Sequence, residues 1–148
     1  MKKQVLTAVA LLSLLVTLVM SGYANSGRIL VDIPFAFTAG KVTLPAGKYV
    51  VEQTSMIGNV LRIRAVEGKG QTYLNTMSND TARMAQSKAQ LVFHRYGDTY
   101  FLSQIWEPGS TVVQELPKSA AERELLKKRR NHLAENATAP EIVTVTEQ

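Results

Sequence analysis

The sequence predicts a mainly β protein: an antiparallel β-sandwich or barrel of about seven or eight short strands, followed by a C-terminal α-helix and a flexible tail. Between residues 28 and 115, short runs of alternating apolar and polar residues are interrupted by turn-forming residues about every ten positions, which is typical of antiparallel sheets. After Pro117 the pattern becomes that of a helix, with a capping sequence at its start. The pattern leaves open whether the sheet is an open sandwich or a closed barrel.

The N-terminal segment (residues 1–24) predicts a secretory signal peptide. Lys2 and Lys3 precede an uncharged run rich in leucine, valine and alanine, and the small residues Gly22 and Ala24 follow at positions that suit signal peptidase. An uncleaved anchor is the alternative, but a membrane span needs about 20 apolar residues. This run is shorter and contains two threonines and a serine. We therefore expect cleavage after Ala24 and export to the periplasm or the extracellular space.

Composition narrows the class of protein further. Removal of 24 of the 148 residues leaves 124, enough for one domain with a modest core. Because the chain has no cysteine, burial has to provide its stability without disulfides, and a lipoprotein anchor is excluded. The formal net charge is +5, of which Lys2 and Lys3 contribute two, and most of the remaining positive charge lies in residues 118–132. Since the basic residues gather in one segment, we expect no nucleic-acid-binding face on the domain.

The predicted β domain covers residues 25–117, and its turns follow from residues that favour them. Pro34 lacks an N–H group and separates the first two strands. The sequence from Leu44 to Gly47 is typical of a β-turn, with proline at its second position and glycine at its fourth. Glycines near residues 58 and 68 supply two more turns. The predicted strands cover residues 28–33, 35–38, 48–54, 59–66, 71–76, 89–96, 99–106 and 111–115.

The clearest hairpin joins residues 89–96 to residues 99–106 through the two-residue loop Gly97-Asp98. Such a loop suits a primed turn, because glycine accepts the positive φ that matches strand twist. Both faces carry apolar groups, so we expect the hairpin to be central or covered. The expected cross-strand pairs are Tyr96 with Thr99, His94 with Phe101 and Val92 with Ser103 on one face, and Arg95 with Tyr100, Phe93 with Leu102 and Leu91 with Gln104 on the other.

Residues 77–88 show no strand alternation and predict the longest loop, and long loops on β scaffolds often carry binding sites.

A basic amphipathic helix is predicted at residues 118–134. It begins with a capping box in which Ser119 and Glu122 each satisfy a backbone N–H group. Residues 135–148 predict a flexible acidic tail, although the alternation from Ile142 to Thr146 could add an edge strand. Three leucines share one arc of the helix, and the pattern does not decide whether they dock on the β domain: Leu125, Leu126 and Leu133.

We expect no catalytic residue, no metal ligand and no cofactor. His94 and His132 are the only histidines, and neither a cysteine nor a Gly-x-Ser-x-Gly elbow is present. We predict a hydrogen-bonded, structural His94 and a solvated His132. Two distant histidines without cysteine do not provide a structural zinc site, and the acidic residues are too dispersed for a calcium loop. The glycines at positions 68 and 70 lack a following helix that would receive a phosphate.

Two features are candidates for binding. The aromatic residues could form an exposed platform that binds a sugar or a protein. We nevertheless expect most of them in the core, because tyrosine and tryptophan are equally common at buried positions where the polar tip of the side chain has a hydrogen-bond partner. Lys127, Lys128, Arg129 and Arg130 could make weak contact with an anionic surface. The alternative is a solvated helix face whose cations complement the helix C-terminus. The aromatic candidates are Tyr49, Tyr73, Tyr96, Tyr100, Phe101 and Trp106.

Four segments of the sequence form a recognisable set: Val31–Phe37, Leu44–Tyr49, Phe93–Leu102 and Glu115–Ser119. Together they resemble a group of small, secreted, uncharacterised proteins abundant in acidobacterial genomes. The resemblance spans most of the expected mature chain. It implies a bacterial source and an envelope or extracellular location, and it brings no activity, cofactor or site residue.

The sequence therefore predicts an exported, non-enzymatic β-domain protein that serves as a binding or structural component of the cell envelope, with an envelope protein or glycan as partner. The first alternative is a β-barrel that binds a small ligand, and the second is a hydrolase. A filled interior would favour the first prediction, and an enclosed apolar cavity would favour the ligand-binding barrel. A carboxylate or hydroxyl within hydrogen-bond reach of His94 would favour the hydrolase.

Overall fold

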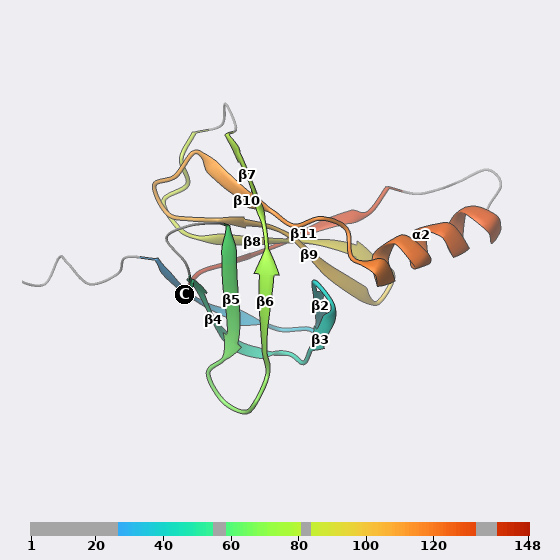
Figure 1. The fold of residues 1–148 in the computed structure, drawn as a ribbon, viewed down its shortest axis with the longest axis horizontal. Helices are drawn as coiled ribbons and strands as arrows, with labels where there is room; N and C mark the ends of the chain where they lie inside the picture. The colour runs from blue at the N-terminus through green and yellow to red at the C-terminus, as the bar shows by residue number, and fades with distance from the viewer. Residues whose placement is uncertain (1–26, 55–58, 81–83, 133–138) are drawn as a thin grey trace, which may run out of the picture.

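The described part of the chain folds into two β-sheets and a C-terminal helix, and the predicted mainly β class is confirmed (Figure 1). The computed structural model describes residues 27–54, 59–80, 84–132 and 139–148. The predicted signal peptide at residues 1–24 lies outside the described residues. Among these residues the sheets do not close into a barrel. Of the two predicted architectures, sandwich and barrel, the structure therefore supports a sandwich-like arrangement.

The first sheet is antiparallel and contains four strands in the order β1-β4-β5-β6. Its strands alternate between buried apolar side chains and exposed side chains, as the two-residue period of a strand requires. On β5, for example, Ile63 is buried and Arg64 is exposed. The strands are β1 (Arg28–Ile33), β4 (Gly47–Gln53), β5 (Val60–Ala65) and β6 (Gln71–Asn75).

The second sheet has the order β11-β8-β9-β10-β7, and β2 joins it through a short parallel contact with β9. At one edge of the molecule, the Gln148 N–H group donates to the Leu30 carbonyl at 3.5 Å, which brings the chain just after β11 to β1 of the first sheet. The strands are β2 (Phe37–Ala39), β3 (Val42–Leu44), β7 (Met77–Asp80), β8 (Gln90–Tyr96), β9 (Thr99–Trp106), β10 (Val112–Glu115) and β11 (Glu141–Thr146).

Apolar side chains from both sheets form one main core. Phe93 lies at its centre, with its ring edge-to-face against Phe35 at 5.2 Å and Phe37 at 5.5 Å between centroids. Tyr49 is buried there too, and its hydroxyl donates to the Pro45 carbonyl at 2.6 Å, so its polar tip has a partner. A second cluster, on the other face of the second sheet, contains Val92, Trp106 and Val113.

The predicted hairpin is present, but its register is only partly as expected. Gly97 has φ of 66°, as the primed turn required, and the pairs nearest the turn are confirmed, from Tyr96 with Thr99 to Phe93 with Leu102. Beyond them the prediction is wrong, because a β-bulge leaves Ser103 without a paired residue on β8. Its hydroxyl donates to the Val92 carbonyl at 3.0 Å. As a result Val92 pairs with Gln104 and Leu91 with Ile105.

Three segments form strands that the list of predicted strands did not include. The first is β3 (Val42–Leu44), which pairs with β2 between two predicted strands. Residues 77–80, expected within a long loop, form β7, which pairs with β10. All four β7 side chains are exposed, so no apolar alternation marks this strand. The prediction of a flexible tail is also wrong for residues 141–146, because these residues form β11, which pairs with β8 along its whole length. Only the alternation from Ile142 to Thr146 indicated it.

The predicted helix is α2 (Ala120–His132). The prediction extended to residue 134, and residues 133–138 lie outside the described part of the chain. Figure 1 shows α2 leaving the second sheet beside the turn of the β8–β9 hairpin and extending away from both sheets. None of the described helices is long and apolar enough to cross a membrane.

Candidate functional site

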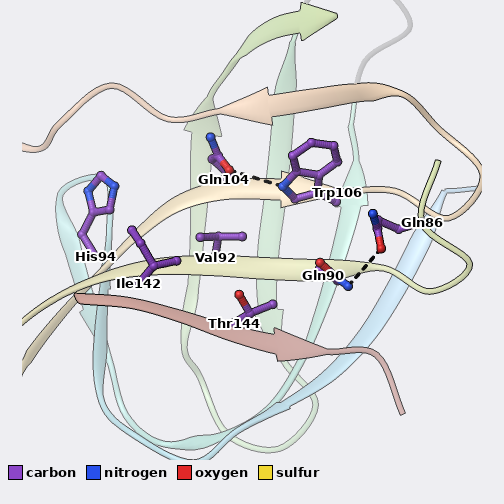
Figure 2. A pocket seen from close by; sticks show the side chains of 8 residues that line it. All are labelled: Gln86, Gln90, Val92, His94, Gln104, Trp106, Ile142 and Thr144. Atoms are coloured by element: carbon purple, nitrogen blue, oxygen red, sulfur yellow. Dashed lines mark hydrogen bonds between the residues drawn. The ribbon is translucent and has the colours of Figure 1, made fainter. Parts of the chain in front are cut away.

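The outer face of the second sheet, which points away from the main core, carries a surface hollow of about 270 Å³ (Figure 2). We call it the outer-face hollow. Strands β8, β9 and β11 supply most of its lining, and one residue comes from the segment that precedes β8. The lining residues are Gln86, Gln90, Val92, His94, Gln104, Trp106, Ile142 and Thr144.

Strand alternation and the bulge at Ser103 together place these side chains. On β8, the period of two brings Gln90, Val92 and His94 to the outer face. On β9, the bulge shifts the register so that Gln104 pairs with Val92. Without that extra residue, the regular register would have placed Gln104 opposite Leu91, whose side chain lies in the main core.

Trp106 is almost fully buried at the floor of the hollow, with 5% of its surface exposed. Its indole Nε1 donates to Gln104 Oε1 at 3.3 Å, and Gln104 Nε2 donates to Glu115 Oε1 at 3.1 Å. Gln90 Nε2 lies 3.5 Å from Gln86 Oε1 (Figure 2). The amide groups are therefore held in place by neighbouring side chains, so the hollow is partly ordered before any ligand binds.

A cluster of three titratable residues lies beside the hollow, and we call it the Glu122 cluster. The Glu122 carboxylate comes from the first turn of α2 and is 3% exposed. Its Oε1 lies 2.9 Å from His94 Nδ1 and accepts a hydrogen bond from the Tyr96 hydroxyl at 3.0 Å. His94 belongs to both the cluster and the hollow, so α2 and the hollow share one side chain.

The predicted capping box is half correct. The Ser119 hydroxyl accepts a hydrogen bond from the Glu122 N–H group at 3.1 Å, as a helix N-cap does. The Glu122 carboxylate points instead toward the sheet, where Tyr96 and His94 bind it. A capping box gives the carboxylate one backbone donor, whereas the sheet offers two side-chain partners in a buried position, where hydrogen bonds to charge are strongest.

The electrostatics of the cluster suit a structural contact. Burial, followed by the neighbouring Glu122 carboxylate, raises the pKa of Tyr96 to about 12. The phenol is therefore protonated at neutral pH and remains a donor to the carboxylate. The Arg129 guanidinium lies over the Tyr96 ring at 5.7 Å. Helix α2 thus docks through Glu122 and Arg129, while Leu125 and Leu126 are only half-buried.

The structure places the candidate site residues that the sequence suggested in different environments. Most of the aromatic residues are buried, as expected, with Tyr100 half-buried and Tyr73 exposed. His94, on β8, is hydrogen-bonded to Glu122 of α2, and the side chain of His132 lies outside the described part of the structure. The glutamines of the hollow were not predicted as a site. The signal in the sequence was weak: glutamines at positions 90 and 104, toward the open ends of a hairpin that carries several other polar residues.

In the described residues, no group of three or more histidine, aspartate or glutamate side chains is placed to hold a metal ion.

The outer face of the first sheet carries a separate charged row across three strands. There Glu52 is paired with Arg28 at 3.1 Å and with Arg62. The hydrogen bond from Arg62 holds the pKa of the Glu52 carboxyl below its usual value of 4.5, and the charges of Arg28 and Arg64 add to this effect, while burial opposes it.

We expect Glu52→Gln to remove part of the acid sensitivity of folding. A carboxyl with a lowered folded-state pKa stabilises the fold above its unfolded-state pKa, and this contribution is lost as the pH falls through the folded-state value. The variant should therefore be less stable than the original protein at about pH 7, and the difference should shrink toward about pH 3 in urea unfolding. Glu67→Gln, at an exposed carboxyl, is the matched control. A difference that does not change with pH would contradict the ion-pair assignment.

Comparison with family models, with curated proteins and with solved structures gave no match for this chain.

Proposed function

We propose that this protein is exported and acts without catalysis, as a binding or structural component of the cell envelope. The observation that supports this proposal is the packing between the sheets. Side chains such as Phe37, Tyr49 and Phe93 occupy that space and are at most 1% exposed. A barrel that holds a small ligand would need an interior cavity there. The outer-face hollow instead offers polar groups on the surface of a rigid sheet.

Export is the first part of the proposal to test. When the full chain is expressed in a bacterium, its processed product should be found outside the cytoplasm, and N-terminal sequencing of that product should begin at Asn25. Ala24→Arg, which places a bulky cation at the cleavage site, should block processing and leave the longer chain at the membrane. Protein that begins at Met1 and remains in the cytoplasm would contradict export.

The basic end of α2 supports weak contact with an anionic envelope surface. Lys127, Lys128 and Arg130 are exposed on a helix that extends from the body, while Arg129 is half-buried and faces Tyr96. Each exposed cation near such a surface contributes about 1 kcal/mol. Replacing these three exposed residues with Gln should therefore weaken binding to vesicles that contain anionic lipid by roughly tenfold or more.

The matched control for vesicle binding removes three exposed lysines from the body of the protein, Lys41, Lys69 and Lys88, also by replacement with Gln. This control lowers the net charge equally and should have a smaller effect. Equal losses in the two variants would show that net charge, and not the helix, determines the contact.

A hydrolase is the second candidate, because one observation favours it. The Glu122 carboxylate lies within hydrogen-bond reach of His94, as an orienting acid would. The neighbouring hydroxyls do not fit a nucleophile. Ser103 donates its proton to the Val92 carbonyl, and Tyr96 stays protonated with its pKa raised to about 12. We expect His94→Gln to leave any hydrolytic activity within a few-fold, and complete loss of hydrolysis in a folded variant would favour the hydrolase.

A further inference from the structure

We propose that the outer-face hollow binds a neutral saccharide, with one sugar ring seated over Val92 and Trp106. This inference rests on the proposed role as an envelope-binding protein and names its ligand class as a glycan without charge. The hollow combines three features that suit such a ligand: an uncharged hydrogen-bonding lining, an oriented histidine and an apolar floor.

The lining matches the chemistry of hydroxyl groups. Among the residues that the structure describes, three glutamines and one threonine surround the hollow, and no aspartate, glutamate, lysine or arginine lines it. A glutamine amide provides both donors and acceptors, and a threonine hydroxyl does the same. Each sugar hydroxyl also donates and accepts. A charged ligand would find no opposite formal charge among these residues, so the lining selects against acidic sugars and phosphates.

The Glu122 cluster gives His94 a defined role at this site. Because the Glu122 carboxylate only accepts hydrogen bonds, the proton of a neutral His94 ring lies on Nδ1, which faces it. Nε2 is then an acceptor. Since His94 lines the hollow, its Nε2 is suited to receive a hydrogen bond from a sugar hydroxyl. Glu122 is therefore a positioning residue, acting on the ligand through His94.

The floor and the size fit one ring of a longer glycan. Val92 and Trp106 form the apolar floor, and the half-exposed Ile142 extends it at one side (Figure 2). One face of a sugar ring carries mainly C–H groups and is suited to such a floor. The hollow measures about 270 Å³, just below the roughly 300–1,000 Å³ usual for drug-sized ligands.

Tryptophan fluorescence provides a direct test, because Trp106 is the single tryptophan of the chain and lies in the hollow. The purified mature protein is titrated with maltose, cellobiose and N,N′-diacetylchitobiose, and with trigalacturonate as an anionic comparator. We expect a saturable change in emission with at least one of the neutral disaccharides. Trigalacturonate should bind at least about tenfold more weakly.

Two substitutions on β11 localise the site. Thr144 lines the hollow, whereas Thr146 lies on the same strand and the same face but is not part of its lining. Both threonines are exposed, so a long side chain fits at either position without disturbing the core. Thr144→Arg fills the hollow and should weaken binding by about tenfold or more, while Thr146→Arg should change it by less than about twofold.

Three results would overturn the inference: no saturable response to any neutral disaccharide, tighter binding of trigalacturonate, or equal losses in Thr144→Arg and Thr146→Arg. Circular dichroism of both variants confirms that they fold. Fractionation of the producing cells separates this inference from the proposed function. Envelope association without sugar binding overturns the saccharide site alone, and a cytoplasmic protein that binds sugar overturns the envelope role alone.

Discussion

Phe93→Ala is expected to lower the free energy of unfolding by about 3–5 kcal/mol, the usual range for truncating a buried phenylalanine. The Phe93 side chain is fully buried and contacts the rings of Phe35 and Phe37 edge-to-face. The chain has no disulfide that would compensate for the cavity. Since domains of this size are stable by only about 5–15 kcal/mol, the loss is a large fraction of the total.

Urea unfolding followed by circular dichroism measures this change, with Tyr73→Ala as the control. Tyr73 is an aromatic residue on β6 that is 58% exposed, so its truncation should cost less than about 1 kcal/mol. If Phe93→Ala is too unstable to purify, Phe93→Leu retains most of the volume and should cost about 1.5 kcal/mol or less. Equal costs at positions 93 and 73 would contradict the assignment of the core.

Glu122→Ala is expected to destabilise the attachment of α2 by about 1–3 kcal/mol. The change leaves the buried Tyr96 hydroxyl without its acceptor and also removes the partner of His94 Nδ1. Glu124→Ala is the matched control, because Glu124 lies on the same helix two residues later and is exposed. It should have an effect of less than about 0.5 kcal/mol.

Amide hydrogen exchange of α2 is the direct measurement, since the helix can detach while the sheets remain folded. We expect faster exchange in Glu122→Ala than in Glu124→Ala. A double-mutant cycle with Tyr96→Phe should give a coupling energy of about 0.5–3 kcal/mol between the hydroxyl and the carboxylate. Unchanged exchange in Glu122→Ala, or zero coupling, would show that other contacts hold the helix.

Much of the fold could be predicted from local pattern. The two-residue alternation along β5 and the turn at Gly97 lead directly to strands and a hairpin, because each depends only on neighbouring residues. The pairs close to the turn, such as His94 with Phe101, were correct for the same reason. The error began at Ser103, because nothing in the local sequence distinguishes a bulged residue from a paired one.

The candidate site depended on contacts between distant parts of the chain. Glu122 was expected to bond within its own helix, and it instead contacts side chains 26 and 28 residues earlier. The outer-face hollow required β11 to pair with β8, whereas residues 135–148 were expected to be a flexible tail. Its glutamines are ordinary surface residues until these strands lie side by side.

The sequence by itself determined the mainly β class, the positions of most strands and the start of the helix. Periodicity, turn residues and capping residues act over a few positions, and their energies favour the same local structure wherever the segment lies. The tertiary structure alone decided the register beyond the bulge, the strand character of β7, the orientation of Glu122 and the formation of the outer-face hollow. These features follow from long-range pairing and from the need of a buried carboxylate for hydrogen-bond donors, and neither is expressed in local sequence.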